Sequence, residues 1–282
     1  MSVFADRLAE AVSRAGSPVC VGLDPVYEKL PAELRSGADH CDAIEAFSAG
    51  VIDACRSVVP AVKFQSACFE RYGSRGVRAL ELCVKRAVDA GLAVVLDAKR
   101  GDIGISAEHY AAAAAGIGAH AITVSGYLGM STVEPYLKAG LGVFVLVRTS
   151  NPDSDTVQSE CLTGGETVAE MMARRVAALG KGWMGASGMS SVGAVVGATK
   201  AADAKALRAI MPEQFFLVPG YGAQGGTADD VRAMLTPARG GVLVTASRSV
   251  IYPTSELGVA WQAAVSRAAK GFASEVAAVI RV

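Results

Sequence analysis

Short apolar runs alternate along the chain with longer segments in which alanine and other helix-forming residues recur at helical spacing. The runs are rich in valine, isoleucine and alanine and have the length of buried strands. They occupy residues 19–24, 61–65, 93–99, 121–124, 142–148, 192–198, 215–219 and 241–245. Strands that alternate with helices in this way are typical of a parallel sheet built from strand–helix units. The pattern therefore predicts an α/β protein.

The segments between these runs are predicted to be helices. They occupy residues 42–55, 76–90, 107–115, 132–139, 167–179, 202–210 and 228–235, with further helices over 2–15 and 257–279. The clearest start signal is Thr227, which precedes Asp229 and Asp230 and can cap the helix that follows. The alternation continues without a linker or an internal repeat, so the sequence predicts one domain over residues 1–282.

Two architectures fit such an alternation, a closed (β/α)8 barrel and a doubly wound open sheet. Polar residues stand at or just after the C-terminal end of nearly every predicted strand. They are Asp24, Lys63, Lys99, Ser125, Arg148, Thr199 and Arg248. A barrel builds its site from all the loops at that end, whereas an open sheet gathers its site at one switch point. The distribution therefore favours a single (β/α)8 TIM barrel.

The composition narrows the functional classes. Of the 282 residues, 51% are apolar and 19% are charged, which suits a large core and gives no signature of disorder. The 27 lysines and arginines equal the 27 aspartates and glutamates, so the chain lacks the basic excess of a nucleic-acid-binding protein or of a polybasic membrane protein. We therefore expect neither nucleic acid nor a membrane as a partner.

The N-terminal segment and the cysteines bear on the compartment. The N-terminal segment mixes charged residues into an amphipathic pattern without the apolar core of a signal peptide, and no run of 18 apolar residues occurs. The six cysteines are Cys20, Cys41, Cys55, Cys68, Cys83 and Cys161. Their scattered positions lack Cys-x-x-Cys spacing. The sequence predicts a cytoplasmic protein with reduced thiols.

A dense group of charges follows the third predicted strand and contains Asp97, Lys99 and Asp102. Because successive side chains of a strand point to opposite faces, Asp97 and Lys99 are expected side by side on one face. Gly101 is expected to let the backbone turn sharply, so that Asp102 arrives from another direction. An acid and a base held in this way can act on one ligand, although such charges can also form a structural ion-pair network.

The segments after the last two predicted strands have the features of a phosphate site. Residues 220–226 are rich in glycine, and the second segment contains Arg248. The loops after strands seven and eight of a barrel recurrently bind phosphate, glycine lets backbone amides approach an anion, and arginine can bind it with two hydrogen bonds. A glycine turn beside a surface arginine is the alternative for either feature alone.

Six motifs, in order along the chain, resemble those of the orotidine 5′-phosphate decarboxylase family in its longer bacterial form. One of them is Asp-Ala-Lys-Arg-Gly-Asp over residues 97–102, which matches the Asp-x-Lys-x-x-Asp signature. The others lie at residues 21–25, 62–65, 148–152, 195–199 and 218–226. The resemblance covers nearly the whole chain.

The resemblance implies a TIM barrel that converts orotidine 5′-monophosphate to uridine 5′-monophosphate (UMP) and CO2, the last step of de novo UMP synthesis, without a cofactor. It implies four catalytic residues. Lys99 donates the proton, Asp97 lies beside the substrate carboxylate, Lys63 bridges the ribose and Asp97, and Asp102 completes the array. Loss of CO2 leaves negative charge on carbon, so a cation at that carbon and an acid to protonate it are required.

The resemblance also implies the substrate-binding residues. Asp24 matches a ribose-contacting aspartate, and Arg248 matches the phosphate-binding arginine. Pro219 and Gln224 match positions that line the phosphate and pyrimidine side.

Two departures from the family pattern occur near the ligand. Ser247 stands where the family commonly has glycine, and its hydroxyl is a candidate phosphate donor. Residues 125–129 read Ser-Gly-Tyr-Leu-Gly where relatives often have Asn-Pro-Tyr-Leu-Gly. The neighbouring Ser131 is expected to contact the base.

The resemblance further implies a homodimer with shared active sites. In the family the second aspartate of the signature, here Asp102, enters the active site of the partner subunit. Ile103 would accompany it, and Ser106 matches a hydroxyl of the same shared site.

Two other functions stay open from the residues alone. A related barrel could act as a sugar-phosphate lyase or aldolase, with a metal or with Lys99 as a Schiff-base nucleophile. A non-catalytic phosphoribosyl-binding barrel would keep Arg248 but has no use for Asp97 and Lys99. The three histidines lack metal-ligand spacing, and we expect no metal.

Overall fold

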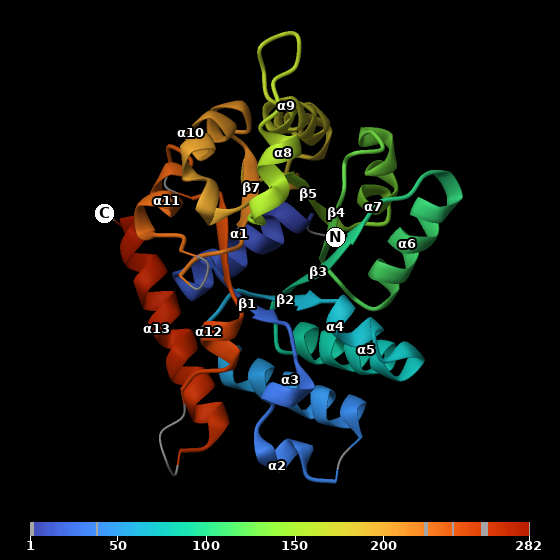
Figure 1. The fold of residues 1–282 in the computed structure, drawn as a ribbon, viewed down its shortest axis with the longest axis vertical. Helices are drawn as coiled ribbons and strands as arrows, with labels where there is room; N and C mark the ends of the chain where they lie inside the picture. The colour runs from blue at the N-terminus through green and yellow to red at the C-terminus, as the bar shows by residue number, and fades with distance from the viewer. Residues whose placement is uncertain (1–2, 38, 223–224, 239, 255–258, 282) are drawn as a thin grey trace.

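The computed structural model describes residues 3–37, 39–222, 225–238, 240–254 and 259–281. Its parallel strands form one closed barrel in chain order, and β8 pairs with β1 (Figure 1). The strands are β1 (Val19–Leu23), β2 (Ala61–Gln65), β3 (Ala93–Arg100), β4 (Ala121–Val124), β5 (Gly142–Arg148), β6 (Ser190–Val196), β7 (Gln214–Val218) and β8 (Val242–Ala246). The predicted TIM barrel is confirmed, and the alternative of a doubly wound open sheet is excluded.

Helices surround the barrel. They are α1 (Phe4–Ala15), α2 (Ala32–Arg35), α3 (His40–Cys55), α4 (Ala67–Glu70), α5 (Gly73–Asp89), α6 (Gly104–Gly116), α7 (Glu134–Lys138), α8 (Asp155–Gln158), α9 (Val168–Gly180), α10 (Ala201–Ile210), α11 (Ala228–Ala233), α12 (Arg248–Ile251) and α13 (Trp261–Arg281). In Figure 1, α3 and α5 cover the lower side of the barrel, α9 and α10 the upper side, and α13 one flank. No helix among the described residues is long and apolar enough to cross a membrane.

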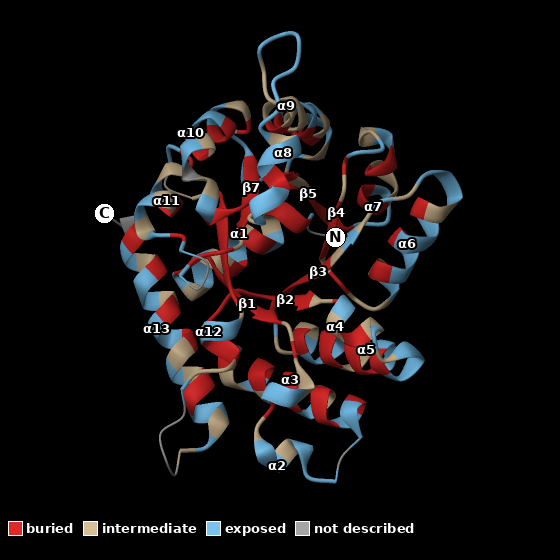
Figure 2. Ribbon diagram, viewed as in Figure 1, coloured by how far each residue is buried: buried red, intermediate tan, exposed pale blue. Residues whose placement is uncertain are grey.

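The core has two layers. One lies between the strands and the surrounding helices, whose barrel-facing sides are buried in Figure 2. The other fills the barrel interior, where α1 inserts Phe4, Ala5 and Leu8 against inward-facing residues such as Phe144. The two phenylalanine rings meet edge to face with centroids 5.8 Å apart. The helix before β1 therefore closes the N-terminal end of the barrel and leaves the opposite end open for a site.

The strand and helix predictions differ from the structure mainly at boundaries. Strand β6 begins at Ser190, two residues before the predicted start, because the Ser190 hydroxyl donates to the carbonyl of Gly180 and can be buried. The helix predicted over residues 132–139 is a 3₁₀ turn, Met130–Thr132, followed by α7. The four-residue helices α2, α4, α8 and α12 were not predicted, since they are too short for a periodic pattern.

Candidate active site

A cavity of about 650 Å³ opens at the carboxyl ends of the strands. One part of its lining carries polar residues of β2, β3 and β4 and of the loop after β1: Asp24, Lys63, Gln65, Asp97, Lys99 and Thr123. Another part comprises residues 149–158 after β5, residues 219–221 after β7 and residues 246–249 at the end of β8. The loops therefore bring together the two groups that the sequence analysis treated separately.

Asp97 is held between two ammonium groups. Its Oδ2 lies 2.8 Å from the Nζ of Lys63, and its Oδ1 lies 2.6 Å from the Nζ of Lys99. Lys63 also pairs with Asp24, at 3.5 Å. Lys63 and Asp97 are buried, whereas the Lys99 side chain is 47% exposed toward the cavity mouth. The predicted proximity of Asp97 and Lys99 is confirmed, and the alternating charges neutralise one another.

Burial and ion pairing act in opposite directions on the buried pair. Burial alone would raise the pKa of the Asp97 carboxyl, but Lys63 and Lys99 outweigh it and lower this pKa to about 2. Burial alone would lower the pKa of Lys63, but Asp24 and Asp97 outweigh it and raise the pKa above its ordinary value. Both groups are therefore charged at neutral pH.

Lys99 departs from regular strand geometry. Its φ is +46°, and among the described residues no other residue except glycine has a positive φ. The backbone N–H of Lys99 donates to Thr123 Oγ1 at 2.9 Å, and the Thr123 hydroxyl donates to Asp97 Oδ1 at 2.9 Å. Strain of this kind persists where neighbouring contacts hold it, and it concentrates at functional sites. Thr123 was not predicted, although a threonine between Ile122 and Val124 in a buried strand is a usable signal.

The expectation for Gly101 is corrected. The left-handed backbone positions in this loop are Lys99 and Gly104, and Gly101 is not among them. A Cβ on Gly101 would instead lie 3.3 Å from the Cβ of Ser125, so this glycine permits close approach of the loops after β3 and β4. The ladder between β3 and β4 shifts register between Leu96 and Arg100, so β3 is already irregular before it ends at Arg100.

Asp102, Ile103 and Ser106 do not line the cavity of their own chain. The Asp102 carboxylate accepts the N–H of Ile103 at 2.8 Å, and the Ile103 side chain is 62% exposed. Ser131 is also exposed and lies outside the cavity lining, although it was expected to contact the base. Further polar residues of the lining come instead from residues 149–158. Residues 149–152 belong to one of the six motifs, and residues 153–158 were not singled out from the sequence.

The far end of the cavity contains Pro219, Ser247 and Arg248. The Arg248 side chain is exposed and forms no ion pair with a carboxylate of the described residues. Gly220 and Gly222 have positive φ values of 92° and 65°, as the predicted glycine turn requires. Gln224, assigned to the same end, lies outside the described residues.

Ser247 packs over β1. A Cβ on Gly22 would lie 1.9 Å from Ser247 Oγ, so the serine side chain fills the space that this glycine leaves. The predicted helix start at Thr227 is confirmed. The Thr227 hydroxyl accepts the N–H of Asp230, and the Thr227 N–H donates to the Asp230 carboxylate. The turn from β7 into α11 is thus fixed at its far end.

All six cysteines are free, and burial raises the pKa of Cys20, Cys55 and Cys83 to about 12. Among the described residues, no group of three or more His, Cys, Asp or Glu side chains is arranged to hold a metal ion.

A closed (β/α)8 barrel whose cavity holds both a paired acid–base array and an exposed arginine defines a TIM-barrel enzyme with a site suited to a phosphorylated ligand. The family described as Orotidine 5'-phosphate decarboxylase / HUMPS matches residues 17–260. The chain belongs to this family.

Individual relatives agree with this assignment. A Rhodopirellula baltica protein named orotidine 5'-phosphate decarboxylase is 41% identical over 293 aligned positions, which cover 95% of this chain and 97% of the relative. A Clostridium perfringens protein of the same name is 38% identical and covers 88% of each chain. The solved structure of Leishmania donovani OMP decarboxylase has a TM-score of 0.81 and 33% identity, and covers 99% of both chains.

Proposed function

We propose that the protein decarboxylates orotidine 5′-monophosphate to UMP and CO2. The observation that carries the proposal is the Asp97 carboxylate held between the ammonium groups of Lys63 and Lys99 at the base of a cavity whose far end presents Arg248. Family membership and the names of the relatives support the same reaction.

The far end of the cavity binds the non-reacting part of the substrate. Arg248 and the backbone amides near Gly220 contact the phosphate, with Pro219 beside them. Asp24 Oδ1 is a buried atom without a hydrogen-bond partner among the described residues, so it accepts a ribose hydroxyl while Lys63 stays 3.5 Å away. These contacts hold the substrate while its reacting end faces like charge.

Lys99 and Asp97 act on the reacting carbon. The bond from C6 to the carboxyl group breaks, CO2 leaves, and the electron pair remains on C6. The Lys99 ammonium stabilises this charge and then donates its proton to C6. Asp97 lies beside the substrate carboxylate and disfavours it relative to the transition state, which the phosphate contacts make possible. The half-exposed Lys99 side chain recovers a proton from solvent.

A second copy of the chain completes the site. Three apolar side chains near the cavity mouth are strongly exposed, Ile103 at 62%, Ile105 at 67% and Tyr127 at 86%. Ile103 and Ile105 follow β3, Tyr127 follows β4, and a hydrogen bond from the Ser125 N–H to the Arg100 carbonyl, at 2.7 Å, joins the two segments. Such a patch supports an interface, and a homodimer would cover it while Asp102 and Ser106 enter the partner's cavity.

The alternative reaction is a sugar-phosphate aldolase or lyase. A Schiff-base nucleophile must be an uncharged amine, whereas the ion pair with Asp97 makes Lys99 a proton donor. The deciding assay follows the absorbance of orotidine 5′-monophosphate in a buffer containing a metal chelator, with and without borohydride. The proposal predicts turnover that resists both reagents. Loss of turnover when either reagent is added, or absence of turnover without them, contradicts the proposal.

We also propose a cytoplasmic location, which the free, mostly buried cysteines support. Cell fractionation tests it, and recovery of the protein outside the cytoplasmic fraction contradicts it.

A further inference from the structure

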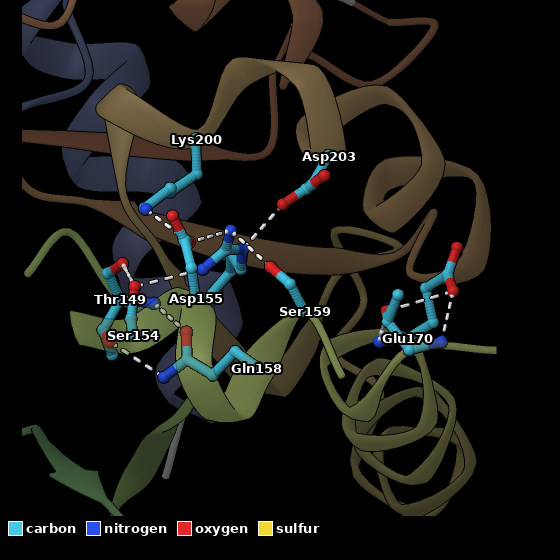
Figure 3. Close-up of polar contacts among 10 residues, drawn as sticks. Thr149, Ser154, Asp155, Gln158, Ser159, Glu170, Lys200 and Asp203 are labelled. Atoms are coloured by element: carbon cyan, nitrogen blue, oxygen red, sulfur yellow. Dashed lines mark hydrogen bonds and ion pairs between the residues drawn. The ribbon is translucent and has the colours of Figure 1, made fainter. Parts of the chain in front are cut away.

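Arg148, the last residue of β5, lies behind the wall of the cavity and does not line it. Its side chain is 5% exposed. Its Nε donates to Asp203 Oδ2 at 2.6 Å, and its Nη2 donates to Asp155 Oδ1 at 2.5 Å. Lys200 donates to the same Asp155 oxygen at 2.6 Å. Figure 3 shows Asp155, Asp203 and Lys200 converging from α8 and from the region where α10 begins.

Two hydroxyls complete this group. Arg148 Nη1 donates to Ser154 Oγ at 3.1 Å, and Nη2 donates to Ser159 Oγ at 3.0 Å. Two cations, Arg148 and Lys200, balance the two carboxylates of Asp155 and Asp203. Because Nε, Nη1 and Nη2 all donate to protein oxygens and the charge is balanced, the guanidinium has little capacity left to bind a phosphate. It binds protein instead, and three of its partners belong to one segment, residues 149–159.

Residues 149–159 supply part of the cavity wall, and hydrogen bonds join the beginning of this segment to its end. The Thr149 N–H donates to Gln158 Oε1 and the Gln158 amide donates to Thr149 Oγ1, both at 2.8 Å. Ser150 and Val157 face the cavity from the same segment. Behind Ser150, a Cβ on Gly197 would lie 2.9 Å from the Ser150 Cβ, so the loop after β6 packs directly against the wall.

We propose that Arg148 is a positioning residue that fixes residues 149–159 as the substrate-facing wall and ties this wall to the loop after β6. The inference rests on the proposed function. Among the described residues, the side-chain hydrogen bonds of Asp97 and Lys99 involve no residue of the wall, so we expect the contacts of the wall with the substrate to be the same before and during the reaction. Their loss therefore weakens binding of substrate and product while the step at Lys99 proceeds.

The test compares Arg148→Met with Arg208→Met. Arg208 is a matched control, since it is equally buried but donates to the carbonyls of Met211, Gln214, Met234 and Gly241, near the starts of β7 and β8 and away from the cavity. Both variants should unfold at lower temperature. Only Arg148→Met should raise KM and the Kd of UMP, by about 10- to 100-fold, with kcat within about threefold of the parent.

Two further variants keep the proposal falsifiable if Arg148→Met does not fold. Gly197→Ala displaces Ser150 without touching a charge and should raise KM, while Arg148→Lys keeps one ion pair and should fall between parent and Arg148→Met. Unchanged KM and Kd in Gly197→Ala, or an equal rise in Arg208→Met, overturn the inference. A parent protein without turnover contradicts the proposed function instead, and the Kd of UMP still decides the role of Arg148.

Discussion

Asp97 is the residue on which the contacts of the site converge, since it accepts hydrogen bonds from Lys63, Lys99 and Thr123. Its pKa of about 2 lies below the ordinary 3.8, so its contribution to stability is present above pH 3.8 and is lost as the pH falls toward 2. Because the pKa of Lys63 is raised, this residue contributes stability that is present below pH 10.5 and is lost as the pH rises above that value. Between these limits the charges of this pair are constant.

Thr123→Val should lower kcat by about 10- to 100-fold while the protein stays folded. The valine has the same shape but cannot accept the Lys99 N–H or donate to Asp97, so the strained backbone at Lys99 loses its support. Steady-state kinetics provide the measurement. Thr123→Ser restores the hydroxyl and should restore most of the activity, and a valine variant as active as the parent would show that the hydroxyl is unimportant.

Arg248→Ala should lower kcat/KM for the nucleotide by about 100- to 1,000-fold, because two charge-assisted hydrogen bonds to phosphate are lost. The corresponding nucleoside lacks the phosphate and should be used almost equally by parent and variant. The ratio of kcat/KM for nucleotide and nucleoside is the readout. A variant that keeps the parental ratio would place phosphate binding elsewhere.

Strands β3 and β4 carry Asp97, Lys99 and Thr123. A hydrogen bond to His120 connects the N-terminal ends of these two strands. The His120 Nδ1 accepts the N–H of Val94 at 3.0 Å, which requires an unprotonated nitrogen. Burial, with a smaller effect of Arg7, lowers the His120 pKa from 6.5 to about 4. The neutral imidazole thus stabilises the fold above pH 6.5, and this contribution is lost as the pH falls toward 4.

We expect acidification from pH 7 to 4.5 to destabilise the parent more than His120→Asn, by about 1–2 kcal/mol after allowance for partial exposure. The asparagine oxygen can accept the Val94 N–H but does not titrate. Denaturant unfolding at several pH values measures the difference. Parallel pH profiles for the two proteins would exclude His120 as the group responsible.

Helices and strands were predictable where buried residues recur at a regular spacing along the sequence. Strands β2, β4 and β5 match their predicted ranges because each is a short, mostly buried run with a polar residue at or just after its C-terminal end. Helix α8 was not predictable, since its residues Asp155 and Gln158 are held by hydrogen bonds from Arg148 and Thr149 and not by a periodic apolar face. The turn after β3 was assigned to the conformational freedom of Gly101, whereas the left-handed residue near the end of the strand is Lys99. Its conformation could not be predicted, because the Lys99 N–H donates to Thr123 of another strand.

For the whole molecule, strand-end polarity placed the site at the correct end of the barrel. The pairing of Asp97 with Lys63 and Lys99 followed from the alternation of side chains and from family resemblance. The wall of residues 149–158 did not follow, because loop conformation depends on contacts between segments that are distant in sequence. Asp102 remains a prediction at this scale, since its expected role lies in a second copy.

The shared site can be tested by mixing Asp102→Ala chains with Lys99→Ala chains under conditions of subunit exchange. In a heterodimer one site collects both defects and the other collects neither, so activity should return to about one intact site per heterodimer. Mass spectrometry verifies the exchange. Activity that stays at the level of the separate mutants would mean that Asp102 acts within its own chain.

The most direct test of the whole account is the separation of turnover from binding in Lys99→Ala. If the Lys99 ammonium acts on charge that forms only in the transition state, kcat should fall by at least about 10⁴-fold while the Kd of UMP changes by less than about tenfold. Calorimetry and the absorbance assay measure the two quantities on the same preparation. A variant that still turns over at a comparable rate, or one that loses UMP affinity in proportion to kcat, would contradict the assignment of the chemistry to Lys99.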